Sequence, residues 1–318
     1  MLNKNRTLLL LIILVLVLVV YFALDQFSNS ESNFRTNLPA FDTAAINHLE
    51  ISSGESGNAF QLRKEDGKWF VMTAGQRYAA DPFAASAMLG GLNGTAIRHV
   101  AGTSSSQWPE FLVTDSTGTR IKFMDDDHTV NDIIVGRFEY IQPKSQVPDQ
   151  FGRRPQGEMI SYLRISGEET VYAVDGMIAL GLGKKPDDFR NKEMLKFNKD
   201  KLQELSINYR DGRSLKFSNT GQSWMLNGQA ADSAAMAKYL ARLSNLRGKH
   251  FARTEPAGED LYVELKLVTN GESPIILKAY RRDTSRYIIT TSQNPTNKFL
   301  EEDEFVKPVF VQAGDFAP

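Results

Sequence analysis

The sequence contains no cysteine, only four histidines and only three tryptophans, and its formal net charge is −1. The lack of cysteine excludes disulfide frameworks, thiolate metal sites and cysteine nucleophiles. A nearly neutral chain also lacks the basic surface that nucleic-acid binding requires, so we expect no nucleic-acid partner. Several classes of function are therefore excluded before any motif is considered.

No catalytic or cofactor motif is present in complete form. "GLGKK" at 181–185 lacks the spacing of a phosphate loop. "DDDH" at 125–128 has potential metal ligands in a row, but consecutive residues on a turn rarely converge on one ion, and a polar hairpin turn is expected there. His99 and His250 each follow a basic residue at the expected end of a helix, where the helix dipole favours cations. We predict a non-enzymatic protein without cofactor or metal.

The amino terminus has the pattern of a membrane anchor. Lys4 and Arg6 precede the uncharged segment 7–24, and Asp25 closes it. A helix of this length spans about 27 Å, close to the thickness of the hydrocarbon core. The positive-inside rule keeps the amino terminus in the cytoplasm. We predict an uncleaved, single-pass anchor in a bacterial inner membrane with the rest of the chain periplasmic; a cleaved signal peptide is the alternative.

Two similar strings lie in the two halves of the chain. "WFVMTAGQRYAAD" runs from Trp69 to Asp81, and "WMLNGQAAD" runs from Trp224 to Asp232. Each follows strand-like runs and precedes a helix-like run, and the residues after the two aspartates stay aligned without a gap. We interpret the tryptophans as core residues of equivalent strands and the aspartates as helix N-caps. An internal duplication explains this pattern economically.

The expected fold class is α+β, with an N-terminal transmembrane helix followed by two homologous β-rich modules. Each module is expected to be of β-β-β-α-β-β type, with one helix packed on an antiparallel sheet. A shared "LVT" at 112–114 and 267–269 supports the match. The expected divisions are 1–24 for the cytoplasmic tip and anchor, 25–44 for a tether, 45–198 for the first module and 199–318 for the shorter second module.

An insertion at 136–159 distinguishes the first module from the second. Its content of proline, glycine and glutamine indicates a long loop, and such loops are usually functional or disordered. It contains residue types that are enriched at protein interfaces: Phe138, Tyr140, Phe151, Arg153 and Arg154. We predict an interaction loop, and a loop without a partner is the open alternative.

The segment 171–209 carries a resemblance to a known family. Its "VYAV" run, its "DFRNKEMLKF" run and the repeated pattern of tryptophan, Ala-x-Asp and Leu-x-x-Leu resemble a family described as a domain of unknown function. Members of that family are single-span bacterial envelope proteins with a duplicated module, often encoded beside ABC-2-type or gliding-motility-type ABC transporter subunits. The resemblance extends from about Ile46 to Phe310. It brings no catalytic residues and implies an accessory role at an ABC exporter.

The favoured function is a non-enzymatic, membrane-anchored accessory subunit that contacts an ABC permease and ATPase, and associated envelope subunits, on the periplasmic side. A periplasmic module that binds cell-wall or surface glycan is the alternative, and it requires Trp69 and Trp224 to line an exposed groove. A periplasmic hydrolase ranks third. We further expect Arg190 to bridge the two modules by pairing with a carboxylate, while Phe189 packs between them.

Overall fold

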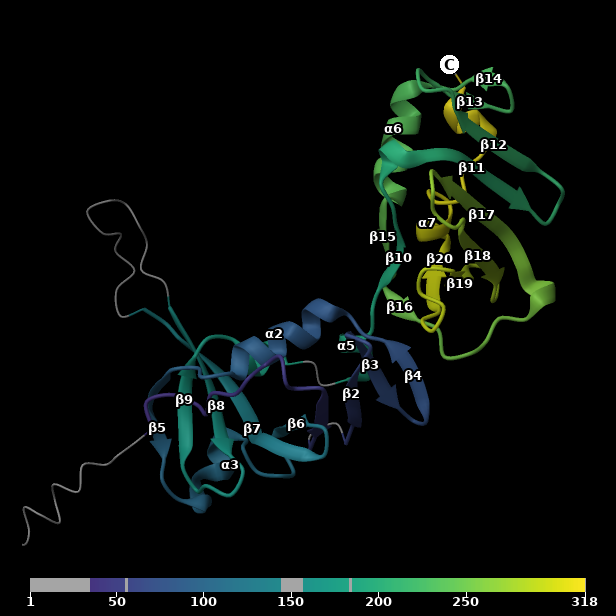
Figure 1. Cartoon of the computed structure of the whole chain (residues 1–318). Coiled ribbons are helices and arrows are strands. Elements are labelled where there is room, and N and C mark those ends of the chain that lie inside the picture. The colour runs from purple at the N-terminus through teal and green to yellow at the C-terminus, as the bar shows by residue number, and fades with distance from the viewer. Residues whose placement is uncertain (1–34, 55–56, 144–156, 183–184, 318) are drawn as a thin grey trace, which may run out of the picture.

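Alternation of apolar and polar residues produces many of the strands. In β1 (His48–Ser53) and β17 (Leu261–Thr269) buried and less buried side chains alternate, as expected where one face of a sheet covers a core. β9 (Val171–Asp175) instead has four buried residues in a row, because both faces of the sheet are covered there. The computed structural model describes residues 35–54, 57–143, 157–182 and 185–317, which form two β-rich modules arranged as an elbow (Figure 1).

The first module is built on a nine-stranded antiparallel sheet with the order β4-β3-β2-β1-β6-β7-β8-β9-β5. Neighbours in sequence pair as hairpins, except that β1 pairs with β6 and β9 pairs with β5. Its remaining strands are β2 (Ala59–Glu65), β3 (Lys68–Thr73), β4 (Gln76–Ala79), β5 (Ile97–Gly102), β6 (Thr119–Asp125), β7 (His128–Ile141) and β8 (Glu158–Ile165). Its helices are α2 (Pro82–Leu92), η1 (Ser105–Gln107), α3 (Trp108–Phe111), α4 (Ile178–Gly181) and α5 (Pro186–Phe189).

The second module is built on another nine-stranded antiparallel sheet, with the order β14-β13-β12-β11-β17-β18-β19-β20-β16. Its strands besides β17 are β11 (Leu202–Tyr209), β12 (Ser214–Asn219), β13 (Trp224–Leu226), β14 (Gln229–Ala230), β16 (His250–Phe251), β18 (Ile275–Arg281), β19 (Arg286–Thr291) and β20 (Phe299–Glu302). A separate ribbon pairs β10 (Glu193–Lys196) with β15 (Asn245–Arg247). Its helices are η2 (Lys199–Lys201), α6 (Ser233–Leu243), η3 (Gly258–Asp260), α7 (Asp303–Val306) and η4 (Ala313–Phe316).

The two sheets have the same strand order when β1–β4 are matched with β11–β14, β5 with β16, and β6–β9 with β17–β20. In both, the long helix follows the fourth strand, and the next strand of the same sheet, β5 or β16, lies at the far edge. α2 buries Ala85, Met88, Leu89 and Leu92, whereas α6 buries Met236, Tyr239, Leu240 and Leu243.

Each module has its own hydrophobic core. The first core includes Phe123 and the second includes Phe217 and Phe299, all fully buried. Each such side chain contributes about 1.5–3 kcal/mol relative to exposure to water. A smaller cluster lies under α3 on the other face of the first sheet. The two modules therefore have separate large cores.

The expected fold class needs correction. Strands dominate the described residues, in two large sheets, so the fold is mostly β rather than α+β. No helix in residues 35–317, with their gaps, is long and apolar enough to cross a membrane, and the segment 7–24 lies outside the described residues. The predicted unit β-β-β-α-β-β also contains too few strands. It omits β4 and β14, which are short polar edge strands without the alternation of apolar and polar residues by which a strand is recognised.

The contacts in the structure place the start of each module earlier in the chain than the sequence predicts. Leu38, assigned to the tether 25–44, is buried in the first core, and its N–H donates to the carbonyl of Thr95 at 2.8 Å. Phe41 stacks on Phe123 with ring centroids 5.0 Å apart. At the other end, β10 pairs with β15 and contributes Met194 to the second core. The first module therefore begins before Leu38, and the second begins before residue 199.

The insertion 136–159 is shorter than predicted, because β7 and β8 extend into it and Tyr140 pairs with Met159. Residues 144–156 lie outside the described residues. The two "LVT" triplets are not equivalent, since 112–114 follows α3 whereas 267–269 ends β17.

Candidate functional site

Each module closes with a segment that follows its last strand and packs against its long helix. We call these segments the first strap, residues 176–182 and 185–189, and the second strap, residues 303–316. The N–H of Asp81 donates to the carbonyl of Phe189 at 2.7 Å, and the N–H of Asp232 donates to the carbonyl of Phe316 at 3.1 Å. Both straps therefore return to the N-terminus of the long helix.

The same local chemistry begins both long helices. The Asp81 carboxylate accepts a hydrogen bond from the N–H of Phe83 at 3.0 Å, and the Asp232 carboxylate accepts one from the N–H of Ala235 at 2.6 Å. Each aspartate thereby satisfies an N–H group that has no partner within the helix. The sequence strings thus place the helix N-termini at equivalent points of the two modules.

The tryptophans of the two strings also occupy equivalent points. The carbonyl of Trp69 accepts from the N–H of Ala80, and the carbonyl of Trp224 accepts from the N–H of Ala231, both at 2.9 Å. Trp69 is buried in the first core, and Trp224 is half-buried against the second. Both side chains belong to strands that precede the long helices, and they pack against the cores instead of lining an exposed groove.

A groove lies between α2 and the first strap, with a volume of about 360 Å³. We call it the apolar groove. Its lining residues are Phe83, Ala84, Ala87, Met88, Gly91 and Leu92 from α2, and Ile178, Leu182, Asp188 and Phe189 from the strap. Asp188 alone among them is charged, so the groove offers almost no polar group to a ligand.

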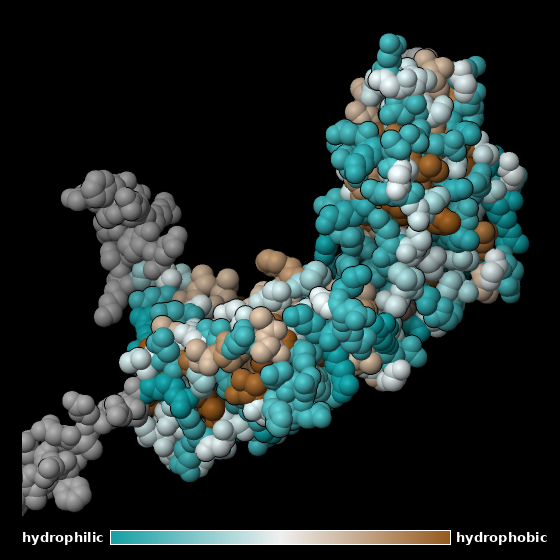
Figure 2. Space-filling view, in the orientation of Figure 1, coloured by the Kyte–Doolittle hydropathy of each residue, from teal (hydrophilic) through white to brown (hydrophobic). Residues whose placement is uncertain are grey.

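Large apolar side chains stand exposed on and beside this groove. Phe83 is 80% exposed, Leu180 63% and Met177 54%. Figure 2 shows hydrophobic residues at the surface on the side of the first module along which α2 runs in Figure 1. A contiguous exposed apolar patch on a folded protein marks a site of interaction with another molecule.

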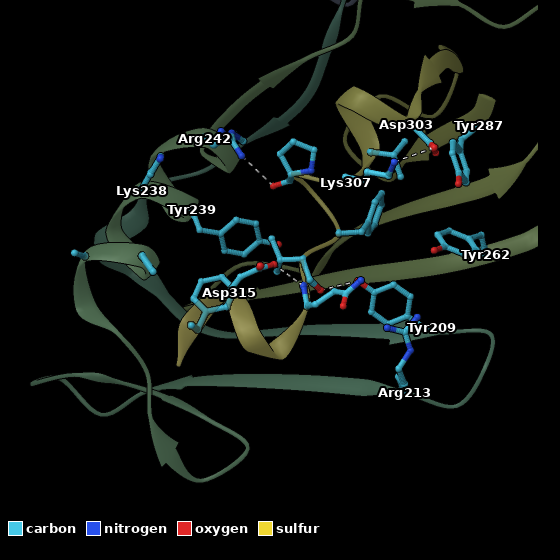
Figure 3. A pocket seen from close by; sticks show the side chains of 18 residues that line it. Tyr209, Arg213, Lys238, Tyr239, Arg242, Tyr262, Tyr287, Asp303, Lys307 and Asp315 are labelled. Atoms are coloured by element: carbon cyan, nitrogen blue, oxygen red, sulfur yellow. Dashed lines mark hydrogen bonds and ion pairs between the residues drawn. The ribbon is translucent and has the colours of Figure 1, made fainter. Parts of the chain in front are cut away.

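The corresponding groove of the second module has different chemistry (Figure 3). It lies between α6 and the second strap, has a volume of about 820 Å³, and extends past the strap to the tyrosines of the sheet. We call it the tyrosine groove. Its aromatic and basic lining residues are Tyr209, Tyr239, Tyr262, Tyr287, Phe310, Phe316, Arg213, Lys238, Arg242 and Lys307.

Two of the tyrosines hold the second strap in place. The hydroxyl of Tyr209 donates to the carbonyl of Val311 at 2.7 Å, and the hydroxyl of Tyr239 donates to the carbonyl of Val309 at 2.6 Å. Burial raises the pKa of Tyr209 to about 12 and raises the pKa of Tyr239 well above its usual value. Both hydroxyls therefore remain neutral donors at physiological pH.

The cations of the tyrosine groove are partly committed to neighbours. Arg213 pairs with Asp211 at 2.8 Å, and Lys307 pairs with Asp303 at 3.2 Å. Arg242 donates a long hydrogen bond of 3.4 Å to a strap carbonyl. Lys238 stands one helical turn before it on the exposed face of α6. This edge of the groove is positively charged, in contrast to the apolar groove.

Arg190 lies at the junction of the two modules and is only 2% exposed. Its guanidinium carbon is 3.7 Å from the ring centre of Tyr78 in the first module and 3.8 Å from that of Phe251 in the second. Its Nε donates to Asn297 of the second module at 2.7 Å, and a terminal nitrogen pairs with Asp187 at 3.1 Å. Burial lowers the pKa of Arg190, and Asp187 opposes that shift. The residue bridges the modules by stacking as well as by charge.

Further contacts surround Arg190. Asp187 also pairs with Arg253 of the second module at 2.6 Å, and Asp81 pairs with Arg247 at 3.0 Å. Phe189 does not pack between the modules, as the sequence suggested, but lies in the first core with its ring 5.5 Å from that of Phe60. It faces inward because α5 turns it toward the first sheet, and only the next residue reaches the junction.

The predicted interaction loop is only partly described. Phe138 and Tyr140 belong to β7: Phe138 packs on the first core, whereas Tyr140 is half exposed. Phe151, Arg153 and Arg154 lie outside the described residues. The structure therefore does not bring this set together into one site.

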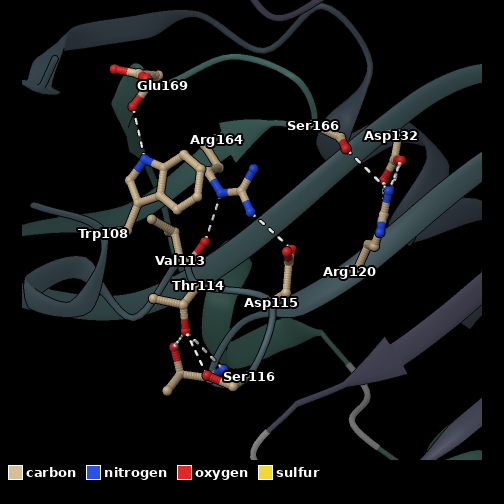
Figure 4. A network of polar contacts seen from close by, with 11 residues as sticks. Trp108, Val113, Thr114, Asp115, Ser116, Arg120, Asp132, Arg164, Ser166 and Glu169 are labelled. Carbon is tan, nitrogen blue, oxygen red and sulfur yellow. Dashed lines mark hydrogen bonds and ion pairs between the residues drawn. The ribbon is translucent and has the colours of Figure 1, made fainter. Parts of the chain in front are cut away.

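A buried arginine that the sequence did not single out organises the loop around α3 (Figure 4). The guanidinium carbon of Arg164 lies 3.8 Å from the ring centre of Trp108, and its Nε donates to the carbonyl of Val113 at 2.7 Å. It also pairs with the exposed Asp115 at 2.9 Å. Trp108 donates in turn to the carbonyl of Glu169 at 2.8 Å. The contacts hold the loop to the sheet, so we assign them a structural role.

The histidines and the acidic run lie on sheet edges and turns. His99 is in β5 and His250 is in β16, so neither stands at a helix end as predicted. The helices α2 and α6 end earlier in the chain, and β5 and β16 pair with β9 and β20. "DDDH" forms the turn between β6 and β7, with Asp126 at φ 51°. Within the described residues no three His, Asp or Glu side chains are grouped to hold a metal ion.

Comparison with known families gives one match. A model of DUF4340, a domain of unknown function, matches residues 69–262, from β3 of the first module to β17 of the second. No curated protein and no solved structure matches the chain. The resemblance to a domain of unknown function is thereby confirmed, and the matched region includes α2, Arg190 and α6.

Proposed function

The chain belongs to the DUF4340 family, and we propose that it is a non-enzymatic accessory subunit that binds proteins of an ABC-type export or gliding-motility-type complex. The proposed partners are the permease and ATPase and their associated envelope subunits. The proposed place of contact is the periplasmic side of a bacterial inner membrane. The resemblance of the segment 171–209 to envelope proteins encoded beside such transporters supports this assignment.

The exposed apolar groove is the observation that carries the proposal. Phe83, which lines the groove, and Leu180, which lies between the lining residues Ile178 and Leu182 in sequence, expose most of their surface to water, which is unfavourable for an isolated protein. A bound partner would remove this surface from water and gain about 25 cal/mol for each Å² of apolar area buried. The almost uniformly apolar lining suits recognition of a protein segment better than recognition of a polar small molecule.

The two grooves also support a role as an adaptor. The shared strand order and the equivalent helix caps support descent of the two modules from one ancestral unit, which forms part of the proposal. The grooves have since diverged: Ala87 and Gly91 of α2 correspond to Lys238 and Arg242 of α6. Two docking surfaces of different chemistry on one chain allow it to hold two different partners.

The alternative of a glycan-binding module has less support. It requires the tryptophans of the repeated strings to form an exposed stacking surface. Trp69 is buried in the first core, and Trp224 packs against the second core. We therefore favour protein contact.

The test is affinity purification of the tagged chain in mild detergent, followed by mass spectrometry. We expect the wild type to recover a permease and an ATPase, and a Phe83→Ser, Leu180→Ser double variant to lose them. Val130→Ser is a matched control, because Val130 is 45% exposed on a hairpin strand away from the groove. Equal recovery by the wild type and the double variant would exclude the apolar groove as the contact site.

A further inference from the structure

We infer that the tyrosine groove binds an acidic segment of a partner protein, with carboxylates of that segment on both sides of the second strap. The inference rests on the proposed function, because it gives the chemical character of a protein partner that the proposed function leaves open. It follows from the charge of the groove, from its tyrosines, and from a comparison of the two modules at equivalent positions.

The side chains that line the tyrosine groove carry an excess of positive charge. Four are cationic and two are acidic, although the formal net charge of the whole chain is −1. Both acidic side chains have partners within the strap: Asp303 pairs with Lys307 at 3.2 Å, and Asp315 accepts a hydrogen bond from a backbone N–H at 2.8 Å. Lys238 and Arg242 form no ion pair with any residue that the structure describes. The groove is therefore electrostatically suited to an anionic ligand.

A second group of cations lies around Tyr262. A hollow of about 490 Å³ adjoins the groove and shares Tyr262 with it. The charged residues that line this hollow are Arg210, Arg281, Arg282, Asp260 and Asp283. The guanidinium carbon of Arg281 lies 4.9 Å from the ring centre of Tyr262, and that of Arg213 lies 4.5 Å from the ring centre of Tyr209. Because these two rings are themselves in contact, at 6.1 Å, the stacked arginines flank one pair of tyrosines.

Tyr262 is the tyrosine whose hydroxyl is available to a ligand. The hydroxyls of Tyr209 and Tyr239 donate to strap carbonyls, and the hydroxyl of Tyr287 accepts a hydrogen bond from Arg281 at 3.5 Å. Within the described ranges no residue forms a hydrogen bond with the hydroxyl of Tyr262, and its side chain is half-buried. A carboxylate oxygen of a ligand would supply the missing acceptor.

The tyrosines and cations of this groove have no counterparts in the first module. One row of paired residues crosses each sheet: Ile51, Ile121, Ile133 and Ile165 in the first, and Ile207, Leu265, Leu277 and Thr291 in the second. Counted along the strands from this row, the residues at the places of Tyr209, Tyr262 and Tyr287 are Ser53, Gly118 and Ser161. The two cations of α6 are replaced by Ala87 and Gly91 of α2. The shared strand order therefore does not require these side chains, and a ligand specific to the second module accounts for them.

The position of the strap favours an extended ligand over a small anion. Figure 3 shows Lys238 and Arg242 on one side of the strap, and Arg213 and Tyr262 on the other. A small anion contacts only one of these groups, whereas an extended segment with several carboxylates contacts both. The groove volume of about 820 Å³ is large enough for several side chains of such a segment.

An acidic glycan also carries carboxylates, but it fits the groove less well. Sugar rings stack on open aromatic faces. Tyr209 and Tyr287 are buried, and Arg281 lies against the ring of Tyr262. The groove thus offers cations and a hydroxyl rather than an open ring, so we favour an acidic peptide.

The test uses a fluorescein-labelled octaglutamate peptide, which is titrated with the purified 318-residue chain and followed by fluorescence anisotropy. We expect saturable binding that weakens as salt is added, because salt screens ion pairs, and no binding of octaglutamine. Lys238→Glu should weaken the binding of octaglutamate roughly three- to tenfold. Tyr262→Phe should weaken it roughly fivefold, because it removes the hydroxyl and keeps the ring contacts.

Lys68→Glu is the matched control for Lys238→Glu. Both lysines are exposed, and both substitutions change the net charge of the chain equally. Lys68 lies at the start of β3 in the first module, so its replacement should leave the binding of octaglutamate unchanged.

Four results would overturn the inference: no binding of octaglutamate, equal binding of octaglutamine, equal weakening by Lys238→Glu and Lys68→Glu, or binding that Tyr262→Phe leaves intact. Tighter binding of an eight-unit oligogalacturonate than of octaglutamate would also overturn it, since the ligand would then be an acidic glycan. Octaglutamate binding as expected, without recovery of a permease and an ATPase in the purification experiment, would leave the inference standing and refute the proposed function. Recovery of those partners without octaglutamate binding would do the reverse.

Discussion

Replacing Arg190 by alanine should weaken the junction between the modules more than any exposed ion pair does. The substitution removes a hydrogen bond from a charged donor to Asn297, worth about 1.5–3 kcal/mol. It also removes two stacking contacts, with Tyr78 and Phe251, each worth about 0.5–2 kcal/mol. The alanine variant also avoids the free-energy cost of removing a charged guanidinium from water, and this offsets part of the loss. We expect a net loss of about 3 kcal/mol.

Differential scanning calorimetry measures this effect directly. At about 2–4 °C per kcal/mol for domains of this size, Tm should fall by roughly 6–12 °C. Because the cores are separate, the two modules should then unfold in transitions that lie further apart.

Arg253→Ala is the matched control for Arg190→Ala. Arg253 pairs with the same carboxylate of Asp187, but its side chain is 76% exposed. Its loss should cost at most about 1 kcal/mol. Arg190→Lys should be intermediate, because lysine keeps the charge but not the planar stacking. If Arg190→Ala unfolds within about 2 °C of Arg253→Ala, then the central arginine does not hold the modules together.

Three further predictions concern the second module. Asp232→Ala should lower stability by about 1 kcal/mol through loss of the helix cap, as measured by urea unfolding; an unchanged midpoint would contradict the cap. Burial raises the pKa of Glu301, so the folded state binds the proton of this carboxyl more tightly than the unfolded state does. The stability that the carboxyl contributes is therefore greatest below pH 4.5 and falls as the pH rises toward its folded pKa. Glu301→Gln should therefore flatten the fall of unfolding free energy above pH 4.5, and an unaltered pH profile would refute this. Tyr209→Phe should leave the carbonyl of Val311 without its hydroxyl donor and speed hydrogen exchange of amides in the second strap, whereas unchanged protection would show that the hydroxyl is dispensable.

Local chemistry made some elements predictable. The tryptophan and aspartate of each repeated string fixed a strand end and a helix start, because capping and strand alternation depend on residues near in sequence. The role of Arg190 as a bridge between the modules could be predicted, because two carboxylates lie close to this arginine in the sequence. Its stacking between Tyr78 and Phe251 was not, because those rings come from β4 and β16 and meet only after both modules fold.

The grooves were beyond prediction for a related reason. The sequence shows Phe83 on an apolar helical face, and burial would be the usual reading of such a position. Its side chain is instead 80% exposed, because α2 turns Ala85, Met88, Leu89 and Leu92 toward the core. Likewise, the fold class was misjudged because short polar edge strands such as β4 carry no alternation, so strand content was underestimated.

The sequence by itself determined the absence of cysteine chemistry, the two repeated strings, the helix caps and the likeness to a domain of unknown function. These depend on composition and on interactions between neighbours in the chain. Only the tertiary structure decided that the chain is mostly β, that Arg190 is sandwiched between modules, and that one groove is apolar while the other is lined by tyrosines and cations. Those properties depend on which distant surfaces meet, and burial is settled only when they do.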